Sequence, residues 1–124
     1  MKFGGSSVAD AEKIKNVSRR IAAAKESGDQ VVAVMSARGK TTDGLIADAA
    51  EITTTPNLRE MDMLLSTGER ISCALMAMAL SDLGHQAISF TGSQAGILTD
   101  TAHTKAKIMK ITPERLREAL EQDH

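Results

Sequence analysis

The chain has 124 residues, the size of one domain with a substantial core, and its 42% hydrophobic and 25% charged residues are ordinary for a soluble globular protein. The net charge is −1 and the basic residues are scattered, so we expect neither a nucleic-acid nor a membrane surface, and no apolar run suggests a membrane-spanning helix. A single cysteine, Cys73, excludes an internal disulfide and suits a reducing cytosol, so we expect a cytoplasmic protein.

The N-terminus carries the pattern of a phosphate-binding loop. Lys2 stands just ahead of a turn made by Gly4, Gly5 and Ser6, and a helix is predicted directly behind that turn. Adjacent glycines let backbone N–H groups approach an anion closely, and a helix N-terminus adds unpaired donors. In this interpretation Lys2 is a point charge on a triphosphate and the turn amides are donors. The alternative is a tight turn beside a solvent-exposed lysine.

An amphipathic helix and a short strand follow this turn. Apolar residues recur at spacings of three and four over residues 8–24, and Ser7 with Asp10 resembles a capping box at the helix start. Gly28 is a natural C-terminal stop for the helix. The next run, Val31–Met35, is apolar and mostly β-branched, which is typical of a buried parallel strand.

A polar loop from Ser36 to Thr42 comes at the carboxyl end of that strand, where open α/β sheets usually place their ligands. Its three hydroxyls and two basic residues suit a small anionic substrate. The alternative is a solvated loop in which Thr41 or Thr42 caps the next helix, which is predicted over residues 42–52.

A long helix predicted over residues 58–83 carries an acidic residue at an unusual place. Glu69 lies on a stripe of apolar and small side chains, and Gly68 beside it costs a helix about 1 kcal/mol relative to alanine. We infer that something approaches the helix at this point. A bound ammonium group would satisfy Glu69, and the alternative is a structural ion pair to Arg59, Arg70 or a lysine elsewhere.

The C-terminal third alternates between short strands and turns. A strand is predicted at Ala87–Phe90, and the small polar turn Thr91–Gly96 either lines a site or a subunit contact, or simply ends the strand. Short strands at residues 97–98 and 108–109 are expected to flank a loop through His103. The alternation of strands and helices predicts an α/β layered domain.

The chain ends on a helix that is predicted from an N-cap at Thr112 to about Gln122. No metal-ligand spacing appears among the histidines and the cysteine, so we assign no metal-binding residue. These four side chains are His85, His103, His124 and Cys73.

Taken together, these motifs resemble aspartate kinase (aspartokinase), of the amino-acid kinase superfamily. The resemblance covers nearly the whole chain and implies an α/β, three-layer αβα fold with a mainly parallel sheet. It rests on four segments in the same order: Lys2–Val8, Ser36–Ala37 with Gly39–Asp43, Met61–Ser72 and Ser89–Gly96.

The resemblance implies ATP-dependent phosphorylation of the β-carboxylate of L-aspartate to 4-phospho-L-aspartate, the first step towards lysine, threonine, methionine and diaminopimelate. ATP and Mg²⁺ are the implied cofactors, and the full-length family is expected to form homo-oligomers. The residues that match the family's phosphate site are Lys2 (also the catalytic residue), Gly4, Gly5 and Ser6. Those that match its aspartate site are Ser36, Thr42 and Glu69.

The chain also departs from the family pattern. Only Met1 precedes the lysine, where the family has an apolar strand, and Arg38 stands where it often has methionine. The nucleotide-base half and the ACT regulatory domains are absent from residues 1–124, so we expect an N-terminal, truncated portion of the catalytic domain that is inactive or weakly active alone. The alternatives are another amino-acid kinase, acting on glutamate, N-acetylglutamate or a nucleotide, and a non-catalytic fragment that docks on a partner chain.

Overall fold

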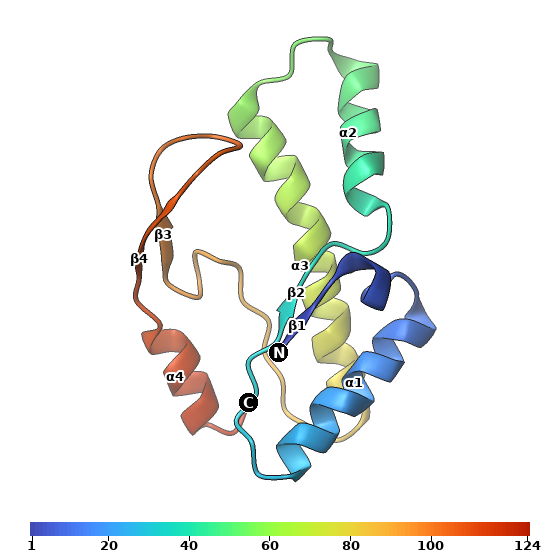
Figure 1. Cartoon of the computed structure of the whole chain (residues 1–124), viewed down its shortest axis with the longest axis vertical. Coiled ribbons are helices and arrows are strands. Elements are labelled where there is room, and N and C mark those ends of the chain that lie inside the picture. The colour runs from blue at the N-terminus through green and yellow to red at the C-terminus, as the bar shows by residue number, and fades with distance from the viewer.

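The computed structural model describes residues 1–124 as helices and short strands in an α/β order (Figure 1). The fold class is therefore the predicted one, although the strands are short. In chain order the elements are β1 (Lys2–Phe3), the 3-10 helix η1 (Gly5–Val8), α1 (Ala11–Glu26), β2 (Val34–Met35), α2 (Thr41–Ile52), α3 (Leu58–Asp82), β3 (Ile97–Thr99), β4 (Ile108–Ile111) and α4 (Glu114–Glu121).

The glycine turn does not lead directly into a long helix, because Gly5 and Ser6 begin the short helix η1, which ends at Val8 before α1 starts at Ala11. Asp10 is the N-cap of α1, and its carboxylate accepts a hydrogen bond from the Lys13 amide at 2.8 Å. The capping box expected at Ser7 is therefore wrong. At the other end, Gly28 adopts a φ of 96°, a left-handed conformation that favours glycine and ends the helix as predicted.

β1 and β2 form a two-stranded parallel sheet in which Lys2 lies opposite Val34 and Phe3 opposite Met35. The Met1 ammonium extends the pairing by donating to the Val32 carbonyl at 2.6 Å. Although only Met1 precedes Lys2, Lys2 and Phe3 themselves form a strand that fixes the start of the glycine turn. β2 is shorter than the predicted strand, since only its last two residues meet the regular pattern.

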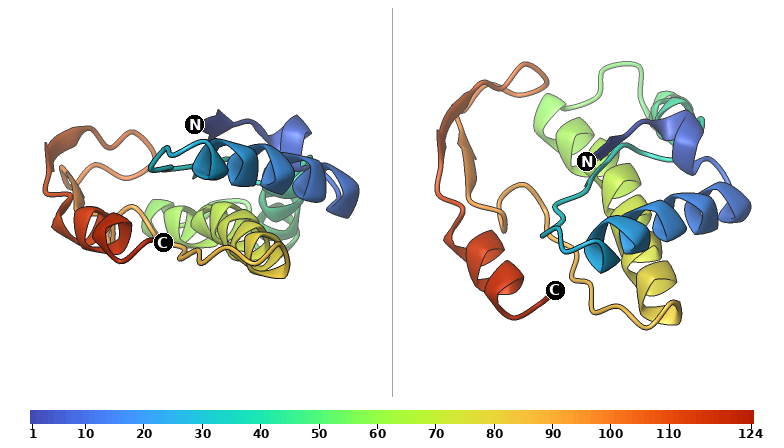
Figure 2. Two further views of the ribbon diagram at one scale, coloured as in Figure 1. Left: turned by 90° about the horizontal axis from the view of Figure 1, so that it is seen from below. Right: turned by 60° about the horizontal axis from the view of Figure 1, so that its bottom comes forward.

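The core lies where α1 packs on α3 and on the parallel sheet. Figure 2 (left) shows α1, β1 and β2 in one layer and α3 in the layer beneath. The apolar stripe predicted for the first helix faces this core, and α3 contributes one side chain per turn near its C-terminal end. The core side chains are Phe3, Val8, Ile14, Val17, Ile21, Ala22, Met35, Met76 and Leu80.

α3 has the length and composition of a membrane-crossing helix, with 25 residues and an 18-residue window of mean hydropathy 1.3. We did not expect such a segment from the sequence. Core helices of soluble proteins have the same properties, and α3 packs against α1 and α2.

The C-terminal third follows the prediction in part. β3 and β4 form an antiparallel pair around the loop through His103, as expected. The Ala87–Phe90 segment is not a strand, because none of its backbone groups has a hydrogen-bond partner. Thr112 does not cap α4; its hydroxyl donates to the Gly96 carbonyl at 3.2 Å, and Pro113 takes the N-cap position.

Candidate functional site

Three segments that are far apart in the sequence meet at the carboxyl ends of β1 and β2. The Ser36 amide donates to the Phe3 carbonyl at 3.1 Å, and the Gly39 amide donates to the Gly5 carbonyl at 3.0 Å. These bonds place the glycine turn against the polar loop that follows β2. We call this region the junction: the turn Gly4–Ser6, the loop Ser36–Thr42, and α3 at Gly68.

Two glycines allow this close approach. A Cβ on Gly5 would lie 2.5 Å from the Ala37 carbonyl oxygen, which is too close for any side chain. A Cβ on Gly68 would lie 2.8 Å from the Ala37 Cβ and 3.6 Å from the Thr41 Cγ2. The prediction that something approaches α3 at Gly68 is therefore confirmed, but the approaching group is the chain's own loop.

Arg38 connects the polar loop to the end of η1. Its Nε donates to the Val8 carbonyl and its Nη2 donates to the Ala9 carbonyl, both at 3.3 Å. Here the guanidinium satisfies two backbone carbonyls that follow the glycine turn. In the sequence, Arg38 stands out only as an unusual charge. Its structural role could not be predicted, because its two carbonyl partners lie about 30 positions earlier in the chain.

The polar residues predicted to bind anions lie around the junction. Lys2 is exposed in β1, Gly4 and Gly5 are half-buried, and Ser36 follows β2 directly. The side-chain hydrogen bonds nearest the loop come from Arg38, and none involves the Ser36 hydroxyl.

Thr42 lies in the first turn of α2 and is half-buried. The N-cap position belongs to Lys40, and no side chain caps this helix. The interpretation of Thr41 or Thr42 as the cap is therefore wrong. The Thr42 hydroxyl takes part in none of the side-chain hydrogen bonds around the loop and this helix.

Glu69 is exposed and forms none of the six ion pairs in the structure. The proposed pair partners are engaged elsewhere: Arg59 with Glu60, and Arg70 with the Ser66 hydroxyl at 3.5 Å. The structural ion pair considered for Glu69 is therefore wrong. Its side chain lines a cavity of about 760 Å³ and is available to a cationic group.

Cys73 lies one helical turn beyond Glu69 and lines the same cavity. Burial raises the pKa of the Cys73 thiol above its usual value of 9.0, and the negative charge of Glu69 raises it further. The side chain is therefore a neutral, weakly reactive thiol at physiological pH, as expected for a small half-buried residue.

The turn Thr91–Gly96 is fixed by its own hydrogen bonds. The Thr91 amide donates to the Gln94 Oε1 at 2.9 Å, and the Gln94 amide donates to the Thr91 hydroxyl at 3.2 Å. Gly96 has a φ of 79°, and a Cβ there would overlap the Thr112 carbonyl. The turn does not end a strand, because residues 87–90 do not form one, and its residues Thr91, Gly92, Ser93 and Ala95 line the cavity beside Glu69.

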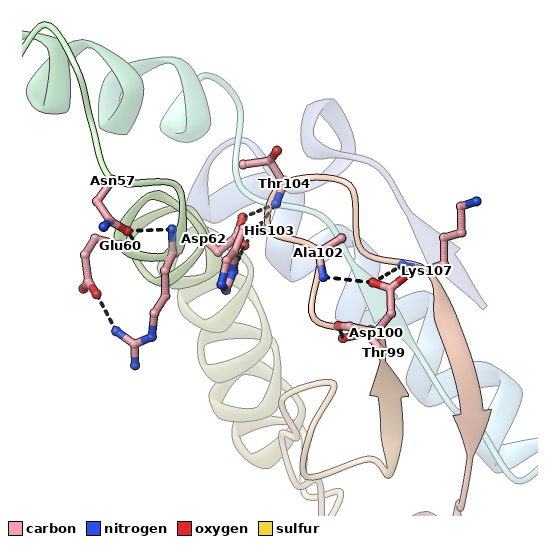
Figure 3. A network of polar contacts seen from close by, with 10 residues as sticks. Asn57, Glu60, Asp62, Thr99, Asp100, Ala102, His103, Thr104 and Lys107 are labelled. Atoms are coloured by element: carbon pink, nitrogen blue, oxygen red, sulfur yellow. Dashed lines mark hydrogen bonds and ion pairs between the residues drawn. The ribbon is translucent and has the colours of Figure 1, made fainter.

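Asp62 ties the loop between β3 and β4 to α3, a role that sequence reasoning missed (Figure 3). Its carboxylate accepts from the Thr104 amide at 3.1 Å and lies 3.0 Å from the His103 Nδ1. Thr104 has a φ of 62°, which is uncommon for a residue other than glycine. Asp100 fixes the same loop by accepting from the Ala102 and Lys107 amides at 3.2 Å.

No three side chains of the His, Cys, Asp and Glu types lie close enough together to hold a metal ion. The side chains of this chain therefore do not by themselves fit the Mg²⁺ that the family resemblance implies.

Comparison with known proteins decides the family. Residues 1–124, the whole chain, match the amino acid kinase family. The chain belongs to the amino acid kinase family. This membership confirms the resemblance drawn from the four motifs.

Several relatives of this chain are aspartokinases. The chain is 57% identical to the aspartokinase of Mycolicibacterium smegmatis, 56% identical to that of Corynebacterium glutamicum, each over 121 residues, and 50% identical to that of Geobacillus stearothermophilus. Each match covers 98% of this chain but only 29% or 30% of the relative. The chain thus spans less than a third of the length of these relatives.

The fold is similar to that of a solved aspartate kinase from Synechocystis. The TM-score is 0.84 at 44% sequence identity, and the match covers 98% of this chain and 20% of that chain. The predicted amino-acid kinase fold is therefore confirmed, with its parallel sheet represented by β1 and β2.

Proposed function

We propose that residues 1–124 are the aspartate-side portion of an aspartate kinase catalytic domain. Such an enzyme transfers the γ-phosphoryl group of ATP to the β-carboxylate of L-aspartate. The observation that carries the proposal is the junction, where the glycine turn and the hydroxyl-bearing loop meet α3 one residue from the unpaired Glu69. We expect the full-length enzyme to be cytoplasmic and homo-oligomeric.

The glycine turn is the proposed phosphate side of the site. Gly4 has open space above its Cα, so an anion can approach the backbone there without steric hindrance. The exposed Lys2 supplies a positive charge on the same edge, and the amides of Gly5 and Ser6 are the further donors. Lys2 is the proposed catalytic residue, since it would neutralise charge on the transferred group.

The polar loop and α3 are the proposed aspartate side. Glu69 would pair with the α-ammonium group, and the hydroxyls of Ser36 and Thr42 would hold a carboxylate. The free carboxylate of Glu69 favours a substrate with an unmodified amino group. This distinguishes aspartate from N-acetylglutamate and from nucleotides, which lack that ammonium.

The reaction needs little acid–base chemistry. The carboxyl group of an aspartate side chain ordinarily has a pKa of about 3.9 and is already ionised at neutral pH, so no general base is required. One of its oxygens forms the new bond to the γ-phosphorus while the bond from that phosphorus to the bridging oxygen breaks, and ADP leaves with the electron pair. Catalysis then consists of positioning two anions and neutralising charge, which suits a lysine and backbone amides.

A hybrid enzyme tests this proposal. This chain replaces the matching region of the Mycolicibacterium smegmatis aspartokinase, and Glu69→Gln is compared with wild type in that hybrid. We expect the KM for aspartate to rise about 10- to 100-fold, the effect of losing one charged hydrogen-bonded pair, with the KM for ATP nearly unchanged. Glu51→Gln, an exposed and unpaired position on α2, is the matched control.

Equal effects of Glu69→Gln on both substrates would contradict the assigned role. A hybrid that phosphorylates N-acetylglutamate as well as aspartate would favour the alternative kinase. For residues 1–124 alone we expect little or no turnover in a coupled assay for ADP release, and robust turnover would refute the proposal that they are only part of the site.

A further inference from the structure

Two consecutive residues of the polar loop hold the two ends of η1. The Gly39 amide donates to the carbonyl of Gly5, the first residue of η1, at 3.0 Å. At the other end, the Arg38 guanidinium donates from Nε to the Val8 carbonyl and from Nη2 to the Ala9 carbonyl, each at 3.3 Å. The loop and η1 are therefore joined at two points, and Arg38 supplies the second.

The Arg38 guanidinium is committed to these two carbonyls. No other side chain donates to either of them, and no backbone amide outside the helices and strands does. Arg38 forms none of the six ion pairs of the chain, so no acidic side chain competes for its donors. Because Val8 is fully buried, loss of the guanidinium would leave the end of η1 poorly satisfied.

The orientation of η1 decides where the amides of the glycine turn point. Gly5 and Ser6 are the first two residues of η1, and their amides are the proposed phosphate donors. Neither amide is used in a loop or turn hydrogen bond, whereas the next one, that of Ser7, donates to the Gly4 carbonyl at 2.9 Å. A tilt of η1 moves both free amides together, and a displacement of about 1 Å can slow a catalysed reaction about 100-fold.

We propose that Arg38 is a positioning residue for phosphoryl transfer. By holding the end of η1 at Val8, it fixes the direction of the amides in the glycine turn, and it touches neither substrate itself. It also joins that turn to the loop that carries Ser36 and Thr42, so the phosphate side and the aspartate side keep one relative position. The inference rests on the proposed function, which makes the glycine turn the phosphate side of the site.

The experiment compares Arg38→Met with wild type in the hybrid enzyme, at a temperature where both are folded. Methionine has an unbranched side chain but no N–H donor for the two carbonyls. We expect kcat to fall about tenfold while the KM for aspartate stays within about twofold, because the phosphate donors are displaced and Glu69 is not. Arg117→Met, at an exposed arginine on α4, is the matched control and should leave both constants within about twofold of wild type.

Two further measurements separate positioning from a merely structural role. Arg38→Lys should keep kcat within about threefold of wild type, because an ammonium group still donates to carbonyls. In the hybrid without substrates, Arg38→Met should accelerate hydrogen exchange of the Ser7 and Gly39 amides about tenfold or more, since both are bonded to residues of the glycine turn. Amides within α3 should exchange as in wild type.

Three results would overturn the inference while the wild-type hybrid phosphorylates aspartate. The first is an unchanged kcat in Arg38→Met, and the second is an Arg38→Lys variant as slow as Arg38→Met. The third is a fall in kcat with unchanged exchange of the Ser7 and Gly39 amides. A wild-type hybrid that does not phosphorylate aspartate would instead refute the proposed function, and with it the role of Arg38.

Discussion

The junction and the Gln86–Phe90 segment differ in how far the backbone of this chain completes them. At the junction, backbone bonds such as Gly39 to Gly5 close the contact within residues 1–124. In the Gln86–Phe90 segment, by contrast, no backbone N–H or C=O group has a hydrogen-bond partner. The comparison shows that a segment with favourable composition becomes regular structure only where a neighbouring segment supplies hydrogen bonds.

Truncating the core that supports both regions should have the largest effect. Met76 is 3% exposed on α3, so Met76→Ala should lower the free energy of unfolding by about 2–5 kcal/mol. Met78, two residues on and 66% exposed, is the matched control and should change it by less than about 0.5 kcal/mol. Urea unfolding followed by circular dichroism measures the free energy of unfolding of both variants. If truncation at Met76 and at Met78 lowers it equally, α3 does not turn Met76 toward the core.

The close contact at the junction predicts the next largest effect. Gly5→Ala should destabilise the chain by about 1–3 kcal/mol, because its Cβ would collide with a backbone carbonyl that cannot move aside independently. Gly4→Ala is the control, since nothing lies within 4 Å of a Cβ there. If the two variants unfold at the same urea concentration, the glycine turn does not pack against the polar loop.

The loop between β3 and β4 should respond to the loss of its anchor. Asp62→Ala removes the acceptor for the Thr104 amide and the partner of His103, and should cost about 1 kcal/mol. Exchange of the Thr104 amide should accelerate while amides of α1 remain unchanged. Asp48→Ala, at an exposed position on α2, is the control and should change neither the stability nor the exchange of the Thr104 amide. If the Thr104 amide stays protected in Asp62→Ala, Asp62 does not anchor the loop.

The smallest effect concerns Cys73, which lines the cavity beside Glu69. Burial raises the pKa of Cys73 in the folded chain above the value of 9.0 that it has in the unfolded chain. The folded state therefore favours the neutral thiol, and this contribution to stability is fully present at a pH below 9.0. This contribution is lost as the pH rises above 9.0 and through the higher folded-state pKa. Stability measured from pH 8 to 11 should therefore fall more in wild type than in Cys73→Ala, and parallel curves would exclude the shift.

A second measurement separates the two causes of that shift. Alkylation of Cys73 by iodoacetamide should need a higher pH than alkylation of a free thiol, and Glu69→Gln should lower that pH slightly by removing a nearby negative charge. An unchanged alkylation profile in Glu69→Gln would mean that burial alone raises the pKa.

The sequence by itself determined the local elements and the family. Periodic apolar residues predicted the helices near their observed bounds, as in α3 and α1, because helix faces are set by spacing along the chain. Gly28 ended its helix as predicted, since a left-handed residue at a helix end is a local requirement. The glycine turn, the polar loop and Glu69 identified the family through their order.

Only the tertiary structure decided what these elements contact. The loop against Gly68, the two carbonyls bound by Arg38 and the anchor at Asp62 all join residues at least 27 positions apart, so no local pattern contains them. The apolar run Ala87–Phe90 has a strand's composition, yet it remains without backbone partners in residues 1–124. A strand forms only when another segment supplies its hydrogen bonds. The tertiary fold, and not the composition of the run, decides whether such a segment lies beside it.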